Sequence, residues 1–130
     1  MAAVTLTGVP SIATDTPCQA HHISGLLAGE AIFAGALCYI KSDGHVWLAT
    51  GAAATAPAKV DGMALQAAAV GDAVSLYTDV NVRYGAGLTP GASLFLSTGG
   101  LIVDAATTGG TAPIGRVVDA TRIRIWGARY

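Results

Sequence analysis

The chain has 130 residues, of which 52% are hydrophobic and only 12% charged, with a formal net charge of −1. This composition excludes a disordered chain, which combines low hydrophobicity with high net charge. Seven Lys and Arg residues against eight Asp and Glu residues leave no basic excess, which argues against a free-standing nucleic-acid-binding domain. Because a surface with so few charges is poorly protected from association, we expect copies of the chain or a larger assembly to cover much of it.

The first 24 residues differ from the rest of the chain. They contain Pro10 and Pro17 and show no sustained hydrophobic periodicity, which is typical of an extended arm. They lack the basic and apolar regions of a secretory signal, and no apolar stretch reaches the roughly 20 residues of a membrane-spanning helix. We therefore predict an extended N-terminal arm over residues 1–24, a single β-barrel-like domain over residues 25–130, and no membrane partner.

From residue 25 onward, short apolar runs alternate with clusters of Gly, Asp, Ser and Thr, a pattern that predicts β-strands. The last run, residues 122–126, alternates polar and apolar residues, which places Ile123 and Ile125 on one face and two arginines on the other. Residues 80–84 alternate in the same way. The remaining predicted strands are residues 36–41, 45–49, 62–66, 73–78, 93–97, 101–104 and 114–119.

Turns and alanine-rich segments separate these strands. Residues 42–44 and 98–100 each contain glycine and join two strands with few residues, which predicts tight hairpins. Two alanine-rich segments compete with a strand-only interpretation, because Ala is the best helix former. Pro57 interrupts the first, so we predict a flexible loop over residues 52–58. The second is too short for a self-sustaining helix, so we expect at most one helical turn around residues 65–69.

An internal repeat organises the domain. Residues 35–46 match residues 91–102 without a gap, at a spacing of 56 residues, and a short second element follows each copy at residues 61–64 and 113–117. The order of strand, glycine turn, strand, loop, glycine and strand therefore occurs twice. Two such units predict an all-β fold, a small β-barrel or β-sandwich made of two related tandem halves.

The sequence shows no recognisable catalytic constellation. Cys18, His21 and His22 lie close together, but adjacent histidines on an extended chain point to opposite sides, so we interpret them as polar arm residues rather than zinc ligands. No nucleophile elbow occurs, most Asp residues adjoin predicted turns, and the Gly-Ala-Gly at residues 85–87 precedes no helix. We therefore predict no catalytic, cofactor-binding or metal-binding residue and no enzymatic activity.

The two cysteines, Cys18 and Cys38, are too few for a disulfide framework, and nothing in the sequence indicates an oxidising compartment. We interpret both as buried free thiols, with a disulfide between them as the alternative.

Arginine and aromatic residues gather at the C-terminal end. Arg116, Arg122, Arg124 and Arg129 fall within the last fifteen residues, beside Trp126 and Tyr130. Anion or nucleic-acid binding is one interpretation, but the chain as a whole is not basic. Arg, Trp and Tyr are the residues enriched at protein interfaces, so we predict a contact between subunits here.

Six segments form a recurring pattern of glycine turns and short strands: residues 29–40, 42–46, 61–64, 71–74, 91–101 and 114–118. This pattern, which covers roughly residues 25–126, resembles tailed-bacteriophage capsid decoration (cement) proteins. The resemblance implies a small, β-rich, homotrimeric protein that binds the outer surface of the phage head between capsomers and stabilises the mature shell. Its partners would be copies of itself and the major capsid protein, and residues 1–24 would reach over neighbouring coat subunits. It would be made in the host cytoplasm and located on the virion.

The candidate residues of this subunit and capsid interface are Val4, Leu6, Val9, Ile12, Arg122, Arg124, Trp126, Arg129 and Tyr130. The alternative function is a β-sandwich module that binds a ligand, such as a carbohydrate, on a virion tail or fibre. Exposed aromatic residues would form such a site, with Trp47, Tyr77 and Tyr84 as candidates. Core packing is the ordinary role of each.

Overall fold

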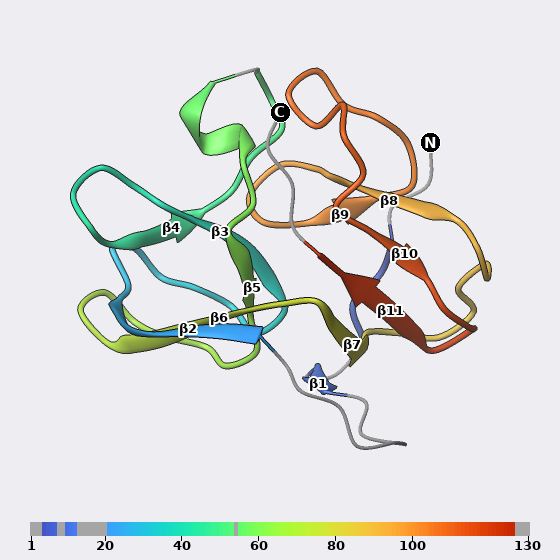
Figure 1. Ribbon diagram of the computed structural model, residues 1–130, viewed down its shortest axis with the longest axis horizontal. Coiled ribbons are helices and arrows are strands. Elements are labelled where there is room, and N and C mark those ends of the chain that lie inside the picture. The colour runs from blue at the N-terminus through green and yellow to red at the C-terminus, as the bar shows by residue number, and fades with distance from the viewer. Residues whose placement is uncertain (1–3, 8–9, 13–20, 54, 127–130) are drawn as a thin grey trace.

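The computed structural model describes residues 4–7, 10–12, 21–53 and 55–126. Their regular structure consists of short strands and one 3-10 helix, η1 (Ala56–Ala58), and all pairings between strands are antiparallel (Figure 1). The strands are β1 (Ser11–Ile12), β2 (His21–Leu27), β3 (Ala36–Ile40), β4 (Val46–Leu48), β5 (Gly62–Ala64), β6 (Ala73–Thr78), β7 (Val80–Arg83), β8 (Ser93–Leu96), β9 (Ile102–Val103), β10 (Gly115–Val117) and β11 (Arg122–Ile125).

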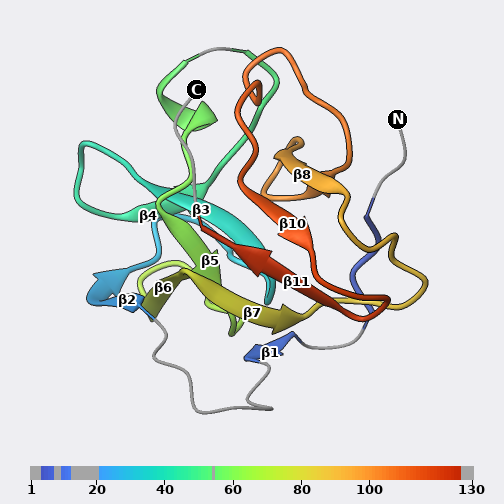
Figure 2. The ribbon, with the colours of Figure 1, turned by 45° about the vertical axis from the view of Figure 1, so that its right-hand side comes forward.

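The strands form two sheets with the same internal order. The first sheet runs β2-β6-β5-β3-β4 and the second runs β1-β7-β11-β10-β8-β9. Strand for strand, β2 to β6 correspond to β7 to β11, and β1 is an addition at the edge beside β7. The two sheets lie side by side in both ribbon views (Figures 1 and 2). This topology confirms the predicted all-β fold of two related tandem halves.

The repeat extends to individual backbone angles. Gly35 and Gly91 precede the first strand of each hairpin with φ of 92° and 83°, and Gly44 and Gly100 lie in the two turns with φ of 83° and 81°. Only glycine adopts this left-handed region without a steric penalty. The 56-residue spacing of the sequence is therefore a repeat of backbone geometry and not only of composition.

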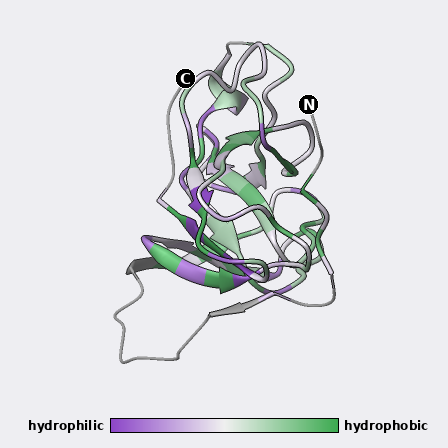
Figure 3. Cartoon of the chain, turned by 90° about the vertical axis from the view of Figure 1, so that its right-hand side faces the viewer, coloured by the Kyte–Doolittle hydropathy of each residue, from purple (hydrophilic) through white to green (hydrophobic). Residues whose placement is uncertain are grey.

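The larger hydrophobic core lies between the two sheets. Fifteen buried residues of the described segments form it, among them Leu37 and Met63 from the first sheet and Leu94 and Ile123 from the second. A smaller core of nine buried residues, including Cys38, covers the other face of the first sheet. Buried and more exposed residues alternate along β7, β10 and β11 of the second sheet, as expected for a sheet that buries one face, whereas β3 and β5 of the first sheet are hydrophobic or small throughout (Figure 3). The second sheet exposes its outer face over much of its area.

The sequence did not predict β1 and β2. The predicted boundary at residue 25 falls inside β2, which pairs with β6 and has a register shift between Ile23 and Leu26. Described residues of the predicted arm also lie against the domain, because the Thr7 N–H donates to the Tyr84 carbonyl over 3.0 Å. The predicted loop at residues 52–58 ends in the 3-10 helix η1, and residues 65–69 contain no helical turn. No helix in the described segments is long and apolar enough to cross a membrane.

Candidate interaction surface

The N-terminal candidate residues lie partly inside the fold. Val4 and Leu6 are half-buried and pack against the larger core. A Cβ atom on Gly35 would come within 2.8 Å of Pro10 Cγ and 3.2 Å of Leu6 Cδ2, so this segment closely covers the start of β3. Ile12 belongs to β1, where its backbone pairs with Val82. Val9, Arg129 and Tyr130 lie outside the described residues.

The outer face of the second sheet brings four arginines together. Arg122 of β11 lies directly opposite Arg83 of β7, and Arg124 of β11 lies directly opposite Arg116 of β10. Arg83, Arg116 and Arg124 are exposed and Arg122 is half-buried. We call this set of four residues the arginine face. Its three strands β7, β11 and β10 are adjacent in the second sheet.

Sequence reasoning identified three of these arginines but missed Arg83. It lies 33 residues before Arg116 and joins the others only because β7 pairs with β11. The alternation of residues 80–84 already placed Arg83 on the polar face of its strand. Only the pairing of that strand with residues 122–125 would have located it.

One carboxylate, that of Asp119, partly compensates the arginine face. It accepts a hydrogen bond from the Arg122 Nε over 2.7 Å and from the backbone N–H groups of Thr121 and Arg122 over 3.0 and 2.8 Å. These hydrogen bonds lower the pKa of Asp119 from 3.8 to about 2. The Thr121 N–H makes the largest contribution and the Arg122 side chain the second largest. The turn between β10 and β11 is therefore built around a charged Asp119.

This geometry predicts a pH-dependent effect of Asp119→Asn. A carboxylate whose folded-state pKa is depressed stabilises the fold above its ordinary pKa of 3.8, and that stabilisation is lost as the pH falls toward about 2. We expect the variant to be less stable than the wild type at pH 7, and the difference to shrink between pH 4 and pH 2. Urea unfolding of both proteins across this range measures it. A difference that does not change with pH would contradict the assignment.

Apolar side chains border the arginine face. Trp126 follows β11 and is 39% exposed, with its Nε1 donating to the Pro113 carbonyl over 3.2 Å. Val118, which follows β10, is 40% exposed. Arginine and tryptophan are among the residue types that are enriched at protein interfaces.

A second polar region lies at the outer edge of β4 in the first sheet. The Lys41 Nζ lies 4.3 Å from the centre of the Trp47 ring, and the Trp47 Nε1 donates to Asp43 over 3.2 Å. The Glu30 Oε1 accepts from the Leu48 N–H over 2.9 Å and so satisfies an edge-strand donor. Trp47 is therefore already engaged by residues of its own hairpin.

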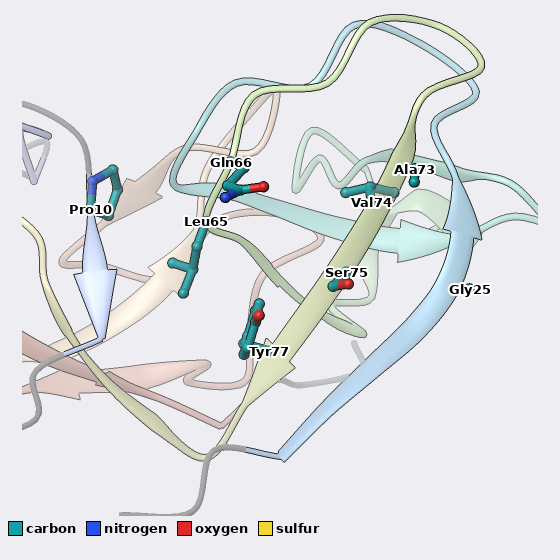
Figure 4. A pocket seen from close by; sticks show the side chains of 8 residues that line it. All are labelled: Pro10, Gly25, Leu65, Gln66, Ala73, Val74, Ser75 and Tyr77. Carbon is teal, nitrogen blue, oxygen red and sulfur yellow. The ribbon is translucent and has the colours of Figure 1, made fainter.

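A groove of about 540 Å³ lies beside β6 (Figure 4). Leu65 and Tyr77 point into the space between β6 and Pro10, and Ser75 adds a hydroxyl group. None of its described lining residues is charged; they are Pro10, Gly25, Leu65, Gln66, Ala73, Val74, Ser75 and Tyr77. The groove therefore offers shape and a few polar groups, but no charged side chain among its described lining residues.

The three aromatic candidates for ligand binding do not form one site. Tyr84 has no exposed surface, and burial raises its pKa to about 12. Trp47 packs at the β4 edge, and only Tyr77 lines the groove. In the described part of the chain, no three His, Cys, Asp or Glu side chains lie close enough to hold a metal ion.

Cys38 is a free thiol with no exposed surface, and burial raises its pKa to about 12. Cys18 lies outside the described residues. Because the thiolate is the reactive form, we expect iodoacetamide to modify Cys38 far more slowly in the native protein than in urea. Mass spectrometry of the Cys38 peptide measures both rates. Equal rates would show that the site opens in the native state.

Compared with protein-family models and with curated protein sequences, the chain matches none. Its function is therefore inferred from the geometry of its own surfaces.

Proposed function

We propose that this chain is a structural decoration protein, which binds the outer surface of a phage capsid between capsomers as a homo-oligomer and stabilises the mature head. The arginine face is the observation that favours a binding role. It exposes paired cations and Trp126 on a regular, rigid sheet. Such a surface suits a broad protein contact better than the recognition of a small molecule.

The tandem fold is also suited to this role. Its two halves share one core, so a contact made by either half is held by the whole domain. Many copies on one shell would let contacts of modest affinity act together.

Electron cryo-microscopy of purified virions from the phage that encodes the chain tests this proposal. We expect density that fits the two-sheet domain on the outside of the shell. We also expect heads that lack the chain to release their DNA at a lower temperature, and added chain to restore the wild-type temperature. A shell without density for the chain would contradict the proposal.

The alternative, a carbohydrate-binding module, rests on the groove beside β6. Tyr77 and the polar Ser75 and Gln66 would contact the sugar there. Binding of the isolated chain to a glycan array, with loss of binding in Tyr77→Ala, would favour this alternative. If the chain binds no glycan on the array, the groove is not a carbohydrate-binding site.

A further inference from the structure

Charge is divided unevenly between the two halves of the fold. Residues 21–78 contain four carboxylates and two lysines, whereas residues 80–125 contain four arginines and two carboxylates, and Asp79 between them adds one further negative charge. The chain is therefore close to neutral only because its two halves compensate each other. The net charge near zero is the sum of an acidic first half and a basic second half.

At Arg116 and Arg124, the arginine face carries positive charge with no carboxylate partner among the described residues. Like charges directly opposite each other on neighbouring strands are destabilising, and this face has two such pairs. Asp119 engages Arg122 at one of them. At the other pair, Arg124 donates only to the neutral Asn81 Oδ1 over 3.3 Å, and neither Arg116 nor Arg124 has a carboxylate partner among the described residues. An external negative surface would remove this repulsion.

The first half presents such a surface. Glu30 and Asp43 flank Trp47 at the edge of β4, and the Asp72 carbonyl accepts from the Ala28 N–H, two residues before Glu30. Asp43 and Asp72 are exposed and Glu30 is half-buried. We call Glu30, Asp43 and Asp72 the acidic edge. The nearby Lys41 lies over the Trp47 ring and offsets only part of this charge.

These two surfaces lie at opposite ends of the molecule. In Figure 1, β4 lies at the left, whereas β10 and β11 lie at the right. We propose that the arginine face of one copy docks against the acidic edge of the next copy. The contact is head-to-tail, so each copy has one surface of each kind left to bind a further copy, and the assembly ends only when it closes into a ring. Trp126 and Val118 would add apolar area to the contact.

A second copy suits the arginine face better than a nucleic acid does. A nucleic acid would have to bind a chain whose overall formal charge is −1, and that charge repels a polyanion at long range. Stacking on aromatic side chains gives single-stranded nucleic acids much of their affinity, and among the described residues Trp126 is the only aromatic more than about a third exposed. The acidic edge of a second copy supplies both the charge and a folded surface.

This inference deepens the homo-oligomer of the proposed function and rests on it. Sedimentation velocity of the full chain at low and high salt tests it. We expect association at low salt that weakens at high salt, because exposed charge pairs are screened. The variant R116Q/R124Q should lower the association constant at least about tenfold, since it removes the uncompensated pair. The control A52E/T55E makes the same change in net charge on an exposed loop and should leave association unchanged.

A reciprocal set of variants tests the partner surface. E30Q/D43N/D72N removes the three charges but keeps an acceptor oxygen at each position, and it should also prevent association. Charge reversal makes the test specific: R116E/R124E alone and D43K/D72K alone should each be monomeric, whereas an equal mixture should associate again. Circular dichroism of each variant verifies that it is folded. A monomeric wild type at low salt, or a mixture that does not associate, would overturn the contact.

Binding to phage heads separates this inference from the proposed function. Heads that bind a chain which stays monomeric in solution would overturn the head-to-tail contact and leave the decoration role intact. A chain that associates as described but does not bind heads would overturn the decoration role alone. Loss of head binding in R116Q/R124Q with unchanged self-association would assign the arginine face to the coat protein and overturn the inference.

Discussion

Replacing Leu94 with alanine is expected to lower the free energy of unfolding by about 2–5 kcal/mol. Leu94 lies in β8, has no exposed surface, and belongs to the core between the two sheets. Its strand pairs with β10 on one side and β9 on the other. Because both neighbours hold the backbone in place, the structure has little freedom to collapse into the cavity, which favours the upper part of this range.

The matched control is Leu101→Ala in the same half of the fold. Leu101 is 47% exposed, so the same change in side chain removes less buried surface than at Leu94. We expect it to alter stability by no more than about 0.5 kcal/mol. Urea unfolding of both variants gives the comparison. A loss at Leu94 as small as the loss at Leu101 would mean that the two halves do not share one core.

The strands of the two repeated units could be predicted because their residues follow local rules. Residues 73–78 form β6 with the predicted bounds, and the strands predicted at residues 80–84 and 122–126 are one residue shorter in the structure. Alternation and glycine turns act within a few residues, so the sequence reports them directly. The strand β2 escaped prediction because its register shift and Gly25 break the alternation.

The candidate surface depends on pairing between distant strands, which no local rule reports. Arg116, Arg122 and Arg124 lie close together in the sequence, so the sequence alone indicates that they form a group. Their arrangement as two directly opposed pairs needed the β7–β11 and β10–β11 registers. The uneven distribution of charge is visible in the sequence. It can be interpreted only when the structure shows where the two halves of the fold begin and end.

Replacing Gly115 with alanine is expected to lower the free energy of unfolding by at least about 3 kcal/mol. This is a large effect for the addition of one methyl group. Gly115 begins β10 and pairs with both β8 and β11. A Cβ atom there would overlap the backbone carbonyl oxygen of Arg124, and this carbonyl belongs to a paired strand and cannot rotate away as a side chain would. The two strands would have to separate where the arginine face is built.

The control, Gly87→Ala, separates the effect of steric overlap on stability from the effect of a left-handed backbone conformation. Gly87 has φ of 68°, and a Cβ atom there would meet nothing within 4 Å, so the variant should lose only the roughly 1–2 kcal/mol of a left-handed alanine.

The tandem repeat supplies a second comparison, because Gly62 occupies the position of Gly115 in the first half and its Cβ would lie 2.8 Å from the Leu76 Cβ. We therefore expect Gly62→Ala to be severe as well, and urea unfolding to rank both variants below Gly87→Ala. A Gly115→Ala protein as stable as Gly87→Ala would contradict the close approach of β10 and β11.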